Sequence, residues 1–155
     1  MQEQDITKLT DEYIYHRYLM NKDQMKKYFQ ELRIPEYIAL QSIARSEPDG
    51  DSSGKVYLRD LAEKMQISIQ QASKMAGEMQ DRGLLTWTHD GNGSEGTYVT
   101  ITPIGAKMMR KQQEAFRAYF GKVIEKFGVD NLEELFRLMY KLERVMKEEL
   151  QLMAE

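Results

Sequence analysis

VYLRDLAEKMQISIQQASKMAGEMQDRGLLTWTHDGNGSEGTYVTITPI, residues 56–104, is the stretch that decides the fold of this 155-residue chain. Apolar residues recur at helical spacing over 58–65, and a second helical pattern occupies 68–83. Ser68 and Gln71 form an S-x-x-Q capping box, which marks the start of the second helix. Gly83 supplies a left-handed stop. The pattern predicts two helices joined by a tight turn.

Strand-forming residues surround the two helices. The runs 85–88 and 97–101 are rich in β-formers and flank residues 90–96, whose glycines and Asx residues suit a hairpin tip. Residues 55–57 form a run just long enough to pair with that hairpin. A helix-turn-helix followed by a β-ribbon predicts a winged helix, with its second helix in a DNA major groove and the ribbon on the backbone or in the minor groove.

The second helix of the pair has an apolar stripe and a polar face. Glutamine side chains can contact adenine, and lysine suits phosphate or guanine. The expected DNA-contacting residues are Ser68, Gln70, Gln71, Ser73, Lys74 and Gly77 on the helix, with His89, Asn92 and Thr97 on the wing. The alternative is an ordinary solvated helix surface beside a polar hairpin.

Further helices are expected on both sides of this region. After a polar start over 1–10, an amphipathic helix is predicted from Asp11, with a kink near 21–23. Pro35 fits the first turn of a helix that runs to about Glu47. Beyond the wing, a long helix is expected from 103 or 104 until Gly128 ends it.

The last helix is expected to begin at a capping-box-like Asp130–Glu133 pattern. Apolar residues then repeat at three-four spacing to the end of the chain, namely Leu135, Met139, Leu142, Met146 and Leu150. Because one small winged domain cannot bury such a seam, we expect a second copy of the chain to cover it. The predicted protein is therefore a homodimer.

The predicted fold class is mainly α with a small β-wing. An N-terminal dimerisation helix over 1–33 precedes a winged helix-turn-helix DNA-binding domain over 34–103, and C-terminal dimerisation helices follow over 104–155. The three segments are expected to form a single integrated domain. A protein of this length can bury about 68–70% of the surface that its unfolded chain exposes.

Composition excludes several classes of function. The chain has no cysteine and two histidines, so sulfur-ligated metals and a histidine-rich metal site are ruled out. Since the sequence offers no nucleophile-base pair and no phosphate-binding loop, it predicts neither an enzyme nor a cofactor. No apolar run approaches roughly 18 residues and no signal-peptide core is present, so we expect a cytoplasmic protein with no membrane contact.

Three short motifs in order resemble those of the MarR-type family of winged helix-turn-helix transcriptional regulators. They are residues 61–68 (LAEKMQIS), 79–85 (MQDRGLL) and 101–105 (ITPIG). The resemblance implies a homodimer on a pseudo-palindromic operator in double-stranded DNA. It also implies a small aromatic effector, bound between the winged domain and the dimer helices, that releases DNA. Aromatic candidates for that site are Tyr13, Tyr28, Tyr37, Phe116 and Tyr119, which could instead be core or interface residues.

The charges of the winged region depart from the family pattern. Gly93 and Glu95 stand where the family wing carries an Asp-x-Arg pattern, and no Lys or Arg occurs over 83–106. Residues 34–103 contain six Lys or Arg against ten Asp or Glu, a net charge of −4. Few cations predict weak DNA binding with a shallow salt dependence. An alternative function is therefore a winged-helix dimer that has lost DNA affinity and acts in protein interaction or ligand sensing.

A calcium loop is a further alternative for one segment. Asp49, Asp51, Ser53 and Asp60 fall at EF-hand ligand positions. The winged-helix interpretation instead requires a strand at 55–57 and places Asp60 on the following helix.

Overall fold

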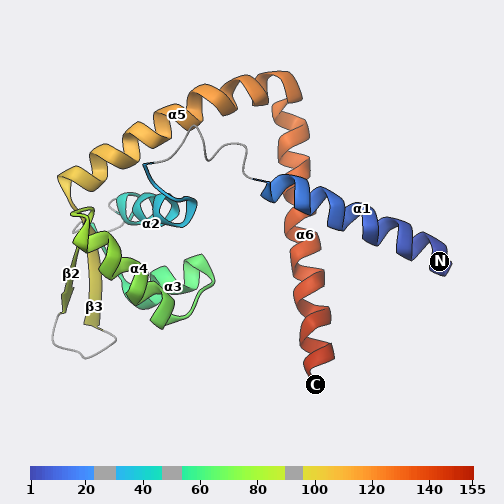
Figure 1. Ribbon diagram of the computed structural model, residues 1–155, viewed down its shortest axis with the longest axis horizontal. Coiled ribbons are helices and arrows are strands. Elements are labelled where there is room, and N and C mark those ends of the chain that lie inside the picture. Colours follow the sequence, from blue (N-terminus) through green and yellow to red (C-terminus); the bar gives the residue numbers. More distant parts are fainter. Residues whose placement is uncertain (23–30, 47–53, 90–95) are drawn as a thin grey trace. The chain divides into compact units, whose positions relative to one another are not determined.

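The computed structural model describes residues 1–22, 31–46, 54–89 and 96–155 (Figure 1). The chain divides into two compact units, Met1–Gln112 and Gln113–Glu155. The first unit contains α1 (Glu3–Asn21), the winged domain and the start of α5 (Pro103–Phe127). The second contains the rest of α5 and all of α6 (Val129–Ala154).

A three-stranded antiparallel sheet forms the β part of the winged domain. Its strands β1 (Lys55–Tyr57), β2 (Leu85–His89) and β3 (Thr97–Ile101) lie in the order β1-β3-β2. Val99 of the central strand pairs with Val56 on one side and with Trp87 on the other. The predicted strands and the predicted pairing of 55–57 with the hairpin are confirmed. The hairpin tip, 90–95, lies outside the described residues.

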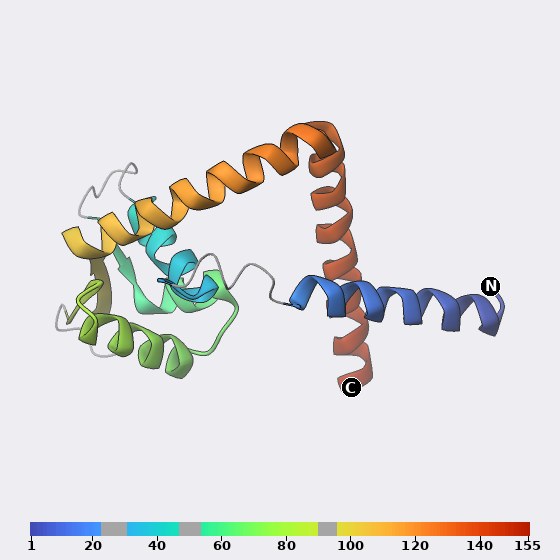
Figure 2. The same cartoon turned by 45° about the horizontal axis from the view of Figure 1, so that its top comes forward.

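Helices α2 (Ile34–Ala44), α3 (Leu58–Met65) and α4 (Ile69–Asp81) complete the winged domain, with α4 beside the β2–β3 hairpin (Figure 2). The turn between α3 and α4 begins at Gln66, whose φ of 56° is left-handed and ends α3. Ser68 then caps α4. The predicted helix-turn-helix and the mainly α fold class are confirmed. Helix α2 ends at Ala44, earlier than the predicted Glu47.

The core of this domain lies between the three helices and the sheet. Its fully buried apolar side chains include Leu40 of α2, Leu61 of α3, Met79 of α4 and Val99 of β3. Each such side chain stabilises the fold by roughly 1.5–3 kcal/mol relative to an exposed one. Because the burial comes from all of these elements, the core fixes the position of α4 against the sheet.

The start of α5 is locked to the turn that follows α4. The Thr102 hydroxyl donates to the Gly83 carbonyl at 2.6 Å and accepts the Gly105 amide proton at 3.0 Å, so Thr102 caps α5. A Cβ at position 105 would lie 1.9 Å from the Leu84 carbonyl oxygen, which only glycine avoids. Residues 103–112 of α5 therefore belong with the winged domain, and Met109 and Gln112 are buried.

Two helix starts differ from the prediction. Helix α1 begins at Glu3, because residues 1–10, although polar, contain no helix breaker. Helix α6 begins after Gly128, whose φ is 100°, and no side chain caps it, so the predicted box at Asp130 is wrong. Asn131 instead donates from Nδ2 to the Phe127 carbonyl at 2.8 Å, which satisfies the end of α5.

Candidate nucleic-acid interface

Helix α4 presents one polar face to solvent. Ala72, Ala76 and Met79 are completely buried beneath it. The exposed residues along the helix are Ile69, Gln70, Gln71, Lys74, Glu78, Gln80 and Asp81, and Ser73 is partly buried. The buried stripe fixes the rotation of the helix, so this exposed face is held outward from the winged domain.

The capping box occupies two of the predicted DNA-contacting residues. The Gln71 amide N–H donates to Ser68 Oγ at 3.1 Å, and Gln71 Oε1 accepts the Ser68 amide proton at 3.0 Å. A bidentate contact to adenine uses both the oxygen and the nitrogen of a glutamine amide. Gln71 must therefore release the cap to make one, whereas Gln70 and Lys74 are exposed without such a role.

Gly77 is partly buried and lies beside β2 of the sheet. A Cβ at this position would lie 3.9 Å from Cζ3 of Trp87 on β2, in ordinary contact distance. The Trp87 amide also donates to Gln80 Oε1 at 2.6 Å. Gly77 thus lies at the α4–β2 junction, where Trp87 packs, and its predicted DNA contact stays a prediction.

The described part of the wing holds a histidine beside a buried threonine. Thr97 is 3% exposed, and its Oγ1 lies 2.8 Å from Nδ1 of the exposed His89. Thr97 is thus placed to orient the imidazole and its side chain does not reach the surface. His89 keeps its place on the wing surface, while Asn92 lies outside the described residues.

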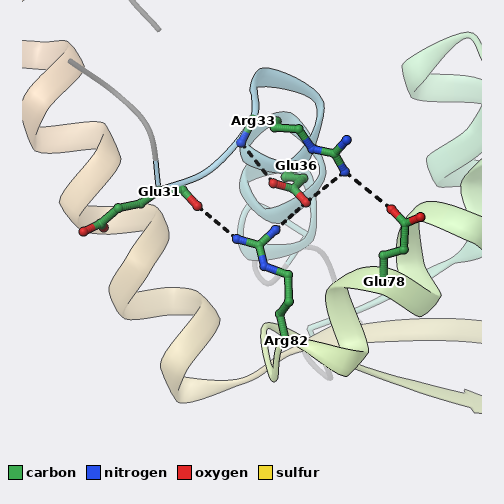
Figure 3. Close-up of polar contacts among 5 residues, drawn as sticks. All are labelled: Glu31, Arg33, Glu36, Glu78 and Arg82. Atoms are coloured by element: carbon green, nitrogen blue, oxygen red, sulfur yellow. Dashed lines mark hydrogen bonds and ion pairs between the residues drawn. The ribbon is translucent and has the colours of Figure 1, made fainter. Parts of the chain in front are cut away.

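A buried carboxylate connects α2 to the C-terminal end of α4 (Figure 3). Glu36 is 1% exposed, and its Oε2 lies 2.6 Å from Arg82 Nη1 and 3.3 Å from Arg33 Nη2. Its Oε1 accepts the Arg33 amide proton at 3.0 Å. Burial by itself raises the pKa of Glu36, but the hydrogen bonds from Arg33 and Arg82 outweigh it and leave the pKa below its ordinary value.

The same cluster neutralises further acidic groups near α4. Arg33 Nη2 lies 3.5 Å from Glu78 Oε2, on the exposed face of α4. Arg82 also donates to the Glu31 carbonyl at 3.0 Å, and Lys111 of α5 lies 2.8 Å from the Glu31 carboxylate. Among the described acids of 34–103, Glu36 is therefore paired with Arg82 and Arg33, and Glu78 is paired with Arg33, which the charge count omits. Sequence patterns gave no sign of this cluster, because Glu36 looks like an ordinary first-turn acid.

No protein-family model and no curated protein sequence matches this chain. Solved structures do. AbsC, a MarR family transcriptional regulator from Streptomyces coelicolor, superposes with a TM-score of 0.68 at 18% identity over 96% of this chain and 97% of its own. The chain has the fold of MarR family regulators.

Two other structures with this fold contain ligands. PcaV from Streptomyces coelicolor, in complex with its natural ligand, has a TM-score of 0.68 at 15% identity and covers 84% of this chain and 89% of its own. A MarR variant from E. coli, complexed with operator DNA, has a TM-score of 0.66 at 14% identity and covers 84% of this chain and 91% of its own.

The motifs that carry the MarR resemblance have structural roles in this chain. Leu61 and Ala62 are buried in the core from α3. Gly83, with φ of 75°, turns the chain out of α4 so that the buried Leu84 can follow. Gly105 gives α5 its close approach to the Leu84 carbonyl. These motif residues therefore build the fold, and Gln70 and Lys74 lie outside the motifs.

The aromatic effector candidates lie on separate parts of the structure. Tyr37 of α2 packs against the core of the winged domain, and Tyr13 of α1 is 38% exposed. In the second unit, Tyr119 and Phe116 each contact the Phe120 ring, with centroids 5.0 Å and 6.2 Å apart. Tyr28 lies outside the described residues. An effector site formed by these residues stays a prediction.

The calcium-loop candidates are only partly described. Asp49, Asp51 and Ser53 lie outside the described residues, and Asp60 is exposed in the first turn of α3. Lys55–Tyr57 is a strand of the winged sheet, as the winged-helix interpretation requires. Among the described residues, no three His, Asp or Glu side chains are grouped so that they could hold a metal ion.

Proposed function

We propose that this chain is a DNA-binding transcriptional regulator that uses α4 as its recognition helix. The observation that carries the proposal is the outward polar face of α4, beside a β-hairpin, in a fold that E. coli MarR has in complex with operator DNA. Gln70 and Lys74 are the side chains assigned to base or phosphate contact, with Ser73 at the edge of the face and His89 on the wing.

The regulator is proposed to act as a homodimer on a pseudo-palindromic operator. Helices α1 and α6 have no buried residue. The exposed apolar residues of α6 include Leu135, Phe136, Leu138, Met139, Leu142 and Val145. A second copy would bury this surface, and two-fold symmetry would place two α4 helices in successive major grooves about 34–36 Å apart.

A small aromatic effector is proposed to release the DNA. PcaV, which shares the fold, was solved with its natural ligand. The aromatic residues Tyr13, Tyr37, Phe116 and Tyr119 could supply stacking surfaces for such a molecule. An effector would act by binding one arrangement of the recognition helices more tightly than the other.

The direct test begins with selection of sites from a random duplex DNA library by the full-length protein. Fluorescence polarisation on an enriched duplex then compares the wild type with Gln70→Ala and Lys74→Ala. Gln70→Ala should weaken binding by about 1–3 kcal/mol and relax specificity at one position of each half-site. Lys74→Ala should weaken binding to all duplexes and reduce the salt slope by about one.

Lys147→Ala is the matched control, because it removes an exposed lysine from α6, outside the winged domain. It should leave affinity and salt slope unchanged. An enriched duplex that binds Gln70→Ala and Lys74→Ala as tightly as the wild type would remove these residues from the interface.

The acidic balance of residues 34–103 favours a second candidate function, a winged-helix dimer without DNA affinity. The pairing of Glu36 and Glu78 with arginines weakens that case, because it reduces the negative field at one end of α4. Salt dependence separates the two functions. Duplex affinity that falls as salt rises favours the regulator, whereas no binding to duplex DNA or heparin at low ionic strength favours the second candidate.

A further inference from the structure

An exposed apolar side chain stands at the N-terminal end of the proposed recognition helix. Ile69 is the first residue of α4 and follows the Ser68 cap directly. It is 45% exposed and is not among the residues packed against the core of the winged domain. The exposed residues that follow it on α4, including Gln70, Gln71 and Lys74, are polar, so Ile69 is the exposed apolar residue at the start of this helix.

The position of Ile69 is the one from which a recognition helix contacts base edges. The N-terminal residues of such a helix enter the major groove most deeply. The thymine C5-methyl is the apolar group that base edges present there, and an aliphatic side chain is its natural partner. Gln70, the next residue, suits the adenine of a neighbouring base pair.

The capping box and the charge of the helix both limit the other side chains of α4 that can recognise bases. The oxygen of the Gln71 amide is engaged with the Ser68 N–H at 3.0 Å, so one of the two candidate adenine readers is tied to the helix start. Lys74 is the exposed cation of α4, and Glu78 on the same face is acidic. Sequence discrimination by this helix therefore depends on uncharged contacts.

We propose that Ile69 is a specificity-determining residue that recognises a thymine methyl group in each half-site. The inference rests on the proposed DNA-binding function and names part of the base sequence that α4 selects. It predicts that binding depends on the methyl group itself and not only on the hydrogen-bonding edge of the A·T pair.

Deoxyuridine isolates that methyl, because it pairs as thymine does and lacks only the C5-methyl. The probe is a duplex enriched from the random library, remade with deoxyuridine at one thymine position at a time. For the wild type, loss of the recognised methyl should weaken binding by about fourfold per half-site, the value expected for one buried carbon group. The other thymine positions should show no change.

Three variants place the effect on Ile69. Ile69→Ala should bind the thymine and deoxyuridine duplexes equally, and Ile69→Val should retain most of the discrimination. Ile34→Ala is the matched control, because Ile34 is the first residue of α2 and is 64% exposed. It should discriminate as the wild type does. Both positions tested are on the surface, so unchanged circular dichroism and melting temperature should accompany each of the three variants.

Each outcome decides the assignment. If the wild type enriches no duplex, the proposed function fails and the role of Ile69 fails with it. If the wild type binds an enriched duplex but tolerates deoxyuridine at every position, DNA binding stands and the methyl contact is overturned. Discrimination that survives Ile69→Ala would likewise overturn it.

Discussion

Glu36 is a buried acid that is held by several hydrogen bonds. Its carboxylate is 1% exposed and receives hydrogen bonds from the Arg33 amide, the Arg33 guanidinium and the Arg82 guanidinium. A buried carboxylate is costly unless it is paired, so these contacts are a condition of its burial. The cluster joins α2 to the residue that ends α4, and it therefore helps to hold the recognition helix in place.

Glu36→Gln should lower the free energy of unfolding by about 1–3 kcal/mol at neutral pH, because two arginines lose a charged acceptor. The pKa of Glu36 lies below its ordinary value of 4.5. The stabilisation it provides is thus complete above the unfolded pKa and is lost as pH falls through the folded pKa. Urea unfolding of both proteins at neutral pH and below about pH 4 should show the difference shrinking at the acidic end.

Glu134→Gln provides the control for this change, since Glu134 pairs with Arg137 on the exposed surface of α6. Exposed ion pairs contribute little to stability, so this variant should unfold like the wild type at either pH. A stability difference for Glu36→Gln that stays constant down to acidic pH would contradict a charged role for Glu36.

Sequence patterns predicted which face of α4 points outward but not what each residue does there. Helical spacing placed Gln70 and Lys74 correctly on the exposed surface. The S-x-x-Q capping box also predicted that the Gln71 side chain accepts the Ser68 amide proton, which limits its use for DNA contact. Glycine has no hydrophobic signature, so the position of Gly77 beside Trp87 is visible only in three dimensions.

At the scale of elements, α4 depends on its N-terminal cap. Ser68→Ala removes the acceptor for the Gln71 amide and should cost about 0.5–2 kcal/mol of stability. Because the cap also orients the first turn, the variant should bind an enriched duplex more weakly than its lost stability alone would cause. Thermal unfolding followed by circular dichroism, together with polarisation on that duplex, measures both effects.

Ser42→Ala is the matched substitution for this test. The Ser42 hydroxyl donates to the Ile38 carbonyl within α2, where alanine is the better helix former. Its stability should therefore be unchanged or slightly raised. Equal losses for Ser42→Ala and Ser68→Ala would argue against a capping role for Ser68.

Elements with local signals were predictable and those without them were not. The strands carry β-rich runs, the α3–α4 turn is followed by a capping box, and α5 ends before a glycine, Gly128. The starts of α1 and α6 carry weaker signals. An Asx residue such as Asp130 can cap a helix or lie within its first turn, and here Gly128 lets α6 begin at Val129, two residues earlier than a cap at Asp130 would.

At the scale of the molecule, the exposed apolar surface of α6 is the proposed contact with a second copy of the chain. Changing Leu142 and Met146 together to Glu should produce monomers or insoluble protein, because two charges would enter the proposed dimer interface. Light scattering after size-exclusion chromatography measures the mass. Lys141→Glu with Lys147→Glu, on the same helix, introduces the same two carboxylates at exposed lysines, with a larger change in net charge, and should leave the dimer intact.

An unchanged dimer in the Leu142 and Met146 variant would place the subunit interface elsewhere. Sequence periodicity could predict that α6 has an apolar seam, since that depends only on spacing. It could not predict what covers the seam, because that depends on a second molecule and on how the two units of the chain are arranged around it.

The two glycines beside the end of α4 set very different limits on mutational tolerance. At position 83 a side chain would meet open space, and only the left-handed φ of 75° opposes it, so asparagine is an acceptable replacement. At position 105 any β-carbon collides with the backbone of Leu84. A saturation library should therefore yield a few folded variants at position 83, and only glycine should be tolerated at position 105.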